Sequence, residues 1–123
     1  GETMRAAGLV DIATVLSTSA YLIESKNPKS DKSLIATIKS RIEGVMTAQR
    51  FVSCIYNAPE DKLPELLKVT PGRRAPTISK IDDEGWVAVS SMIERKTKGV
   101  VLDELKRLGA SDIMVFEISN CRV

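Results

Sequence analysis

Residues 70–79 read Thr70-Pro71-Gly72-Arg73-Arg74-Ala75-Pro76-Thr77-Ile78-Ser79, and residues 86–89 read Trp86-Val87-Ala88-Val89. These two segments decide the fold. Pro71-Gly72 favours a turn, and Pro76 excludes a helix immediately before it. Residues 77–81 and 86–93 are rich in strand-forming side chains, and the polar residues 82–85 join them. The sequence therefore predicts a β-hairpin whose entrance is stiffened by two prolines and made cationic by two arginines, a geometry suited to a small ligand.

On the N-terminal side of this hairpin, the hydrophobic pattern changes its period. Residues 10–16 and 20–23 are apolar and β-branched, which predicts two strands or one bent strand. From Asp31 to Arg50 apolar residues recur every three or four positions, which predicts an amphipathic helix capped by Ser30 or Asp31.

The remaining elements follow from residue 51 onward. Residues 51–56 predict a strand, and the Asn57-Ala58-Pro59 segment predicts a turn into a short helix with Pro64 in its first turn. After the hairpin, the pattern predicts a helix with Thr97 as N-cap and Gly109 at its end, then a last strand over 113–118.

The order of these elements is strand, helix, strand, strand, helix, strand. It predicts an α+β fold with a ferredoxin-like βαββαβ domain over residues 51–123, preceded by strands and a helix in residues 1–50. Because this fold hosts many functions, the site residues must carry the functional argument.

Composition excludes several classes of function. With 18 basic and 16 acidic residues the net charge is only +2, which predicts neither a nucleic acid nor an anionic membrane as partner. No apolar run approaches the roughly 20 residues of a membrane span, so we expect a cytoplasmic protein. The chain has no histidine, and Cys54 and Cys121 lack metal-site spacing, so we expect two buried free thiols, no protein-held metal and no self-contained catalytic residues.

The motif Thr-Pro-Gly-x-x-x-Pro-Thr-Ile, the segment Trp-Val-Ala-Val and the later Leu-Gly-Ala-Ser-Asp-Ile together resemble the C-terminal regulatory domain of long-form ATP phosphoribosyltransferase. Residues 1–9, Gly1-Glu2-Thr3-Met4-Arg5-Ala6-Ala7-Gly8-Leu9, are similar to the latter part of that family's phosphate-binding loop, with Met4 in place of the usual Leu. The resemblance covers essentially the whole chain. Since the sequence opens on a glycine inside this motif, we expect a fragment that has no phosphoribosyltransferase activity alone.

The resemblance implies two sites. It implies that Gly1, Glu2, Thr3 and Met4 help to hold the 5-phosphate of phosphoribosyl pyrophosphate, whose pyrophosphate chelates Mg²⁺ and is displaced by N1 of the adenine of ATP. It implies that L-histidine, as feedback inhibitor, is bound by five residues of the C-terminal domain, and that the parent enzyme is a homo-hexamer with its catalytic residues outside this chain. Those five effector-binding residues are Asn57, Arg73, Thr77, Met92 and Asp112.

Each of these residues also has a purely structural interpretation. Asn57 suits a turn, Thr77 a strand start and Met92 a core, and the basic segment 95–98 suits a solvated surface. We expect Trp86 to anchor the core, because it lies in an apolar strand. The few aromatic residues therefore offer no exposed platform for single-stranded nucleic acid. The alternative function is a stand-alone ferredoxin-like module that binds another small metabolite or pairs sheet edges into oligomers; an RNA-binding module is disfavoured by the few aromatics.

Overall fold

A computed structural model describes residues 2–29 and 31–123 of the chain. Contacts divide the chain into two compact units, residues 1–30 and residues 31–123, which are described separately. No helix within the described residues is both long and apolar enough to cross a membrane.

The first unit contains one short helix, α1 (Glu2–Ala6). It ends in a turn in which the amide of Leu9 donates to the carbonyl of Met4 at 2.9 Å and Gly8 adopts φ 68°. Residues 9–29 form no strand, so the strands expected over 10–16 and 20–23 are wrong as predictions for this structure. A strand needs a neighbouring strand to satisfy its backbone groups, and the described residues pair no segment with this one. Its apolar side chains are accordingly exposed, Ile12 by 99%.

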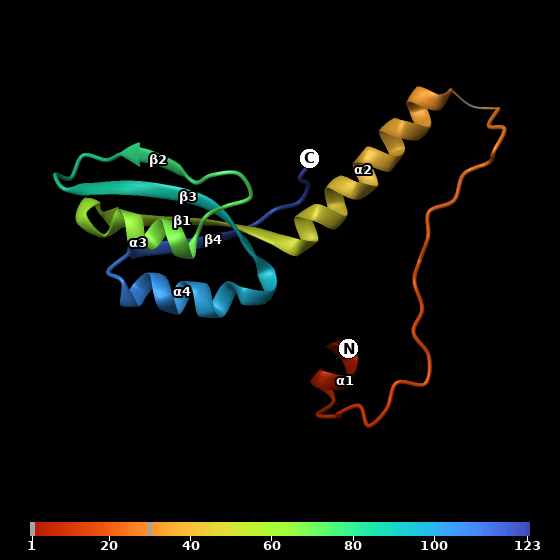
Figure 1. The fold of residues 1–123 in the computed structure, drawn as a ribbon, viewed down its shortest axis with the longest axis horizontal. Coiled ribbons are helices and arrows are strands. Elements are labelled where there is room, and N and C mark those ends of the chain that lie inside the picture. The colour runs from red at the N-terminus through yellow and green to blue at the C-terminus, as the bar shows by residue number, and fades with distance from the viewer. Residues whose placement is uncertain (1, 30) are drawn as a thin grey trace. The chain divides into compact units, whose positions relative to one another are not determined.

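The second unit begins with helix α2 (Lys32–Arg50), as the periodicity predicts. Asp31 is its N-cap, because its carboxylate accepts from the amide of Ser33 at 2.9 Å and from the Ser33 hydroxyl at 2.7 Å. These hydrogen bonds lower the pKa of Asp31. The helix passes into the first strand without a loop and runs away from the end of the sheet (Figure 1).

A four-stranded antiparallel sheet follows, in the order β2-β3-β1-β4. Helices α3 and α4 are each preceded by a short 3-10 turn, and together these elements confirm the predicted α+β fold and its βαββαβ order. The bounds are β1 (Phe51–Pro59), α3 (Leu63–Val69), β2 (Thr77–Lys80), β3 (Trp86–Glu94), α4 (Lys98–Arg107) and β4 (Ser111–Glu117).

Two local predictions need correction. The segment predicted as a turn, residues 57–59, continues β1, because Asn57 pairs with Ala88 and Pro59 pairs with Trp86 at the strand's last position. Thr97 precedes α4 without capping it through its side chain, since its hydroxyl donates instead to the carbonyl of Glu94 at 3.3 Å.

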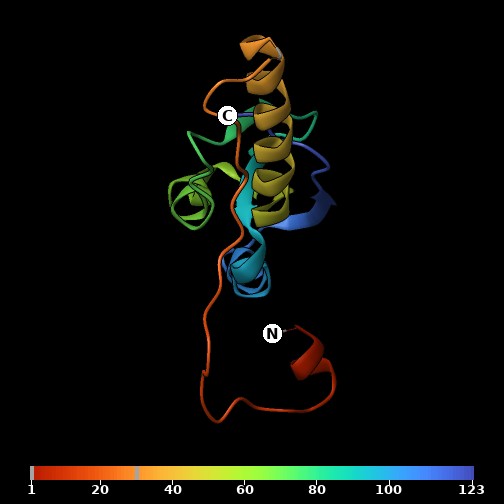
Figure 2. The ribbon, with the colours of Figure 1, turned by 90° about the vertical axis from the view of Figure 1, so that its right-hand side faces the viewer.

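The core lies between one face of the sheet and the two helices. Alternate residues of β1 and β3 are buried on this face, where Leu66 of α3 and Leu105 of α4 are fully buried. Figures 1 and 2 both place α3 and α4 on the same side of the sheet. Trp86 is half-buried and alternates with the buried Val87, so it lies on the opposite face and is not the core anchor that the sequence suggested.

Candidate ligand-binding face

The face of the sheet opposite α3 and α4 carries most of the predicted effector-binding residues. Strand register places Asn57, Thr77 and Met92 on this open face. Asn57 and Met92 alternate with buried residues of their strands, and Thr77 pairs with Ser90 of the same face. Met114 and Phe116 of β4, 47% and 50% exposed, pair with β1 residues of the same face. The open face therefore combines polar groups with exposed apolar side chains.

Asn57 and Asp112 form a direct pair at one end of this face. Ile55 pairs with Met114 and Asn57 pairs with Ser111, so two residues of β4 face a single residue of β1 in a β-bulge. Within the bulge Asp112 has φ 48°, a left-handed conformation that aspartate tolerates better than most residues. The Asn57 amide nitrogen and the Ser111 hydroxyl each donate to Oδ2 of Asp112 at 3.1 Å. Oδ1 of this carboxylate takes part in neither bond and can accept from a ligand.

Thr77 and Met92 lie together at another place on the same face. Thr77 pairs with Ser90, and Met92 is the next residue of β3 on that face. Met92 pairs with Ser53, which is four residues along β1 from Asn57, or about 13 Å at the usual strand rise. Within one chain the structure therefore brings the predicted residues together in two groups, Asn57 with Asp112 and Thr77 with Met92.

The loop that leads to Thr77 is anchored by a buried hydrogen-bond network. The Thr70 hydroxyl donates to the carbonyl of Leu66 at 3.3 Å, so the Tyr56 hydroxyl, 2.7 Å away, is the donor to Thr70. Ser91 donates to the carbonyl of Thr70 at 3.0 Å, and burial raises the pKa of Tyr56. Gly72 has φ 68°, and a Cβ there would lie 3.1 Å from the Ser91 hydroxyl. The loop is thereby held against β3, with Arg73 exposed on it.

A pocket of about 290 Å³ lies where this loop meets the ends of β1 and β3. Its lining is mostly apolar and includes Phe51, Val69, Pro71, Met92 and Val101, with Thr97 and Glu94 as polar groups. Met92 is the predicted effector-binding residue that lines this pocket, whereas Thr77 is not among its lining residues.

Comparison with known proteins supports a family assignment. Residues 48–120 match the family model described as "HisG, C-terminal domain". The chain belongs to this family. It is 80% identical to the ATP phosphoribosyltransferase of Kluyveromyces lactis and 75% identical to that of Candida glabrata, in each case over the whole chain and 41% of the relative. The bacterial ATP phosphoribosyltransferase of Salinibacter ruber is 39% identical over the whole chain and 44% of its own length. The resemblance inferred from the motifs is thus confirmed, and the chain spans about two fifths of the length of these relatives.

The predicted phosphate-binding residues belong to the first unit. Gly1 lies outside the described residues, Glu2 begins α1, and Thr3 and Met4 are exposed in it. Across residues 2–29 and 31–123, no three histidine, cysteine or acidic side chains cluster as metal ligands would.

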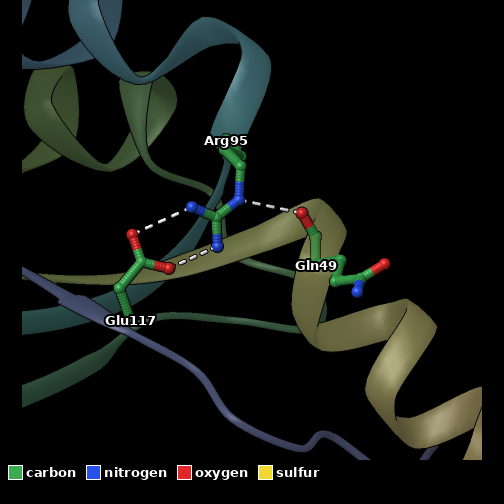
Figure 3. A network of polar contacts seen from close by, with 3 residues as sticks. All are labelled: Gln49, Arg95 and Glu117. Carbon is green, nitrogen blue, oxygen red and sulfur yellow. Dashed lines mark hydrogen bonds and ion pairs between the residues drawn. The ribbon is translucent and has the colours of Figure 1, made fainter. Parts of the chain in front are cut away.

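Sequence analysis missed one polar junction, the contacts of Arg95 (Figure 3). The Arg95 guanidinium donates to both carboxylate oxygens of Glu117, through Nη1 at 2.9 Å and through Nη2, and its Nε donates to the main-chain carbonyl of Gln49 at 2.9 Å. The hydrogen bonds between the two side chains raise the pKa of Arg95 and lower that of Glu117. These partners are 22 and 46 residues from Arg95 in sequence, so no local pattern could have revealed them.

Proposed function

We propose that this chain is the L-histidine-binding regulatory domain of an ATP phosphoribosyltransferase. The observation that carries the proposal is the Asn57–Asp112 pair, which a β-bulge holds at the open sheet face of a chain belonging to the HisG C-terminal family. β-Bulges commonly re-aim a side chain at functional sites, and the left-handed φ of Asp112 fits such a role.

The two groups of residues offer the chemistry that histidine requires. Asp112 can accept from the α-ammonium group of the amino acid, and the Oδ1 atom of Asn57 can accept from a ring N–H. The Thr77 hydroxyl can donate to the second ring nitrogen, Met92 can contact the ring face, and Arg73 can pair with the α-carboxylate.

The separation of these groups favours an oligomeric site. A single histidine is too short to touch residues about 13 Å apart along one strand. A second copy laid against the open face would bring one chain's Asn57–Asp112 pair close to the other chain's Thr77 and Met92, and would cover the exposed Met114 and Phe116. This supports our proposal of a homo-oligomer, with the hexamer as its expected form.

For the whole enzyme we propose transfer of the phosphoribosyl group of phosphoribosyl pyrophosphate to N1 of the adenine of ATP, in the cytoplasm. Residues 1–4 would hold the 5-phosphate mainly through backbone amides, as donors at a chain turn can. Mg²⁺ would arrive bound to the pyrophosphate of the substrate.

Asp112→Asn tests the effector site in the full-length enzyme. Asparagine keeps the shape and the tolerance of a left-handed backbone, so only the charge is lost. We expect histidine to bind roughly ten- to a hundredfold more weakly by calorimetry, because hydrogen bonds to charged groups contribute about 1.5–3 kcal/mol. Inhibition should weaken in parallel while uninhibited turnover stays normal.

Asp103→Asn is the matched control, because Asp103 is also an exposed aspartate but lies on α4, on the other side of the sheet. It should leave affinity and inhibition unchanged. If Asp112→Asn bound histidine as tightly as the parent enzyme, the site assignment would be wrong. If the parent enzyme itself did not respond to histidine, a module for another metabolite would become the better interpretation.

A further inference from the structure

The Arg95 junction defined above joins three elements at one corner of the sheet. Arg95 follows the end of β3, Glu117 ends β4, and Gln49 lies in the last turn of α2. The last carbonyls of a helix lack intrahelical partners and carry partial negative charge, so a guanidinium is well suited to cap them. Figure 3 shows the Gln49 side chain turned away, so the contact uses only its backbone.

A second contact holds the middle of the same helix. The amide of Cys121, beyond the end of β4, donates to the carbonyl of Gly44 at 2.9 Å. Gly44 is buried, and an added Cβ would lie only 2.5 Å from the side-chain oxygen of Asn120. This approach is possible only because residue 44 has no side chain.

The end of β4 is connected to both contacts, since Glu117 pairs with Arg95, which bonds Gln49, and Cys121 follows the strand. Asp112 lies at the start of that strand, in the bulge of the open face, and Glu117 lies at its end. Asp112 therefore lies at one end of β4, and the residues that connect this strand to α2 lie at the other end. Since α2 enters β1 without a loop, these two contacts and the packing of its last turns fix its direction.

We propose that Arg95 is the positioning residue that couples the open sheet face to helix α2. Its fork geometry links β3, β4 and the end of α2, so a change at Asp112 is passed to the helix. This inference rests on the proposed function, because it assigns the route by which histidine binding would reach the remainder of the enzyme.

Arg95→Gln in the full-length enzyme tests the coupling. Glutamine cannot bond both Glu117 oxygens and the Gln49 carbonyl at once, yet Arg95 lies outside the proposed ligand site. We expect the histidine dissociation constant to stay within about threefold of the parent, while the ratio of inhibited to uninhibited turnover changes by about tenfold or more, a typical allosteric coupling. Basal turnover should be unchanged. Glu117→Gln retains the Arg95–Gln49 contact and should also weaken inhibition. It replaces Arg95→Gln as the test variant if Arg95→Gln does not fold.

Two matched controls separate loss of coupling from the general effect of removing a surface ion pair or a polar side chain. Arg107→Gln removes another two-pronged ion pair, with Glu104, that lies wholly within α4. Gln49→Ala alters the residue whose backbone alone is used. Both variants should keep full inhibition. Arg95→Gln with normal inhibition, or with binding and inhibition weakened equally, would overturn the proposal.

A distance measurement distinguishes failure of the coupling from failure of the proposed function. Spin labels at exposed positions 36 of α2 and 103 of α4, with both native cysteines replaced, report the direction of the helix whether or not histidine binds. We expect one narrow distance distribution in the parent and in Arg107→Gln, and a broadened or shifted one in Arg95→Gln. An unchanged distribution would show that Arg95 does not set the position of α2, even if histidine proved to be the ligand.

Discussion

The two faces of one sheet differ in burial between alternate residues of the same strands. Val52, Cys54 and Tyr56 of β1 are fully buried against α3 and α4, whereas Ser53, Ile55 and Asn57 between them are only half-buried on the open face. A strand points successive side chains to opposite sides, so neighbours in sequence experience different environments.

This difference predicts which property, stability or binding, a substitution on each face should change. On the covered face a change removes packed apolar contacts or a satisfied buried hydrogen bond. On the open face the same change leaves the core intact and alters what the surface can bind. The comparison fails if substitutions on the two faces have the same effects on stability and on binding.

The largest expected effect belongs to the covered face, at Leu105. Its side chain is fully buried in the core, so Leu105→Ala should lower the free energy of unfolding by about 2–5 kcal/mol. Met114→Ala is the control from the open face, where the side chain is 47% exposed, and should cost clearly less. Urea titration of both variants measures the contrast, and equal losses would remove the distinction between the faces.

The Cys54 thiol gives the covered face a dependence on alkaline pH. Burial raises its pKa from 9.0 to about 11. The unfolded chain releases this proton near pH 9 and the folded chain near pH 11, so stability present below pH 9 is lost progressively as the pH rises between them. Each pKa unit corresponds to about 1.4 kcal/mol, so the loss should reach about 2–3 kcal/mol.

The measurement is the free energy of unfolding at several pH values in the parent chain and in Cys54→Ala. The contribution of the thiol is the difference between the two pH dependences, because tyrosine and lysine side chains also titrate in this range. The parent should lose more stability than the variant above pH 9. Parallel curves would mean that the Cys54 site admits water and ionises freely.

The periodic elements of the second unit follow from local sequence. The three- and four-residue spacing predicts α2, the prolines and glycine predict the loop before β2, and the order of elements predicts the sheet. The extension of β1 through Pro59 depended instead on pairing with Trp86, which the turn-forming composition of residues 57–59 concealed. Residues 10–23 have strand-like composition, but composition cannot supply a partner strand.

The sequence predicts individual residues of the candidate site through the family resemblance, but it does not predict their contacts. The family resemblance predicts Asn57 and Asp112 as separate effector-binding residues, but the bulge that joins them arises from the register between β1 and β4. The contacts of Arg95 were not predicted, because this residue belongs to a basic segment whose composition is typical of solvated surface. Contacts over long sequence separations are created by the fold, so the sequence around each partner contains little sign of them.

The smallest effect should come from the open face, at Thr77. Thr77→Val keeps a β-branched shape and suits a strand, so the free energy of unfolding should not change measurably. If the hydroxyl bonds histidine, its loss should cost about 1–2 kcal/mol of binding, or roughly ten- to thirtyfold in affinity. Calorimetric titration of histidine into the full-length enzyme and its variant measures this, with Ser79→Ala as control because Ser79 lies on the same strand and face. Weaker binding for Thr77→Val alone would place recognition on this part of the open face. Equal affinities in two folded proteins would leave Thr77 as a strand residue and confine the site to the Asn57–Asp112 end.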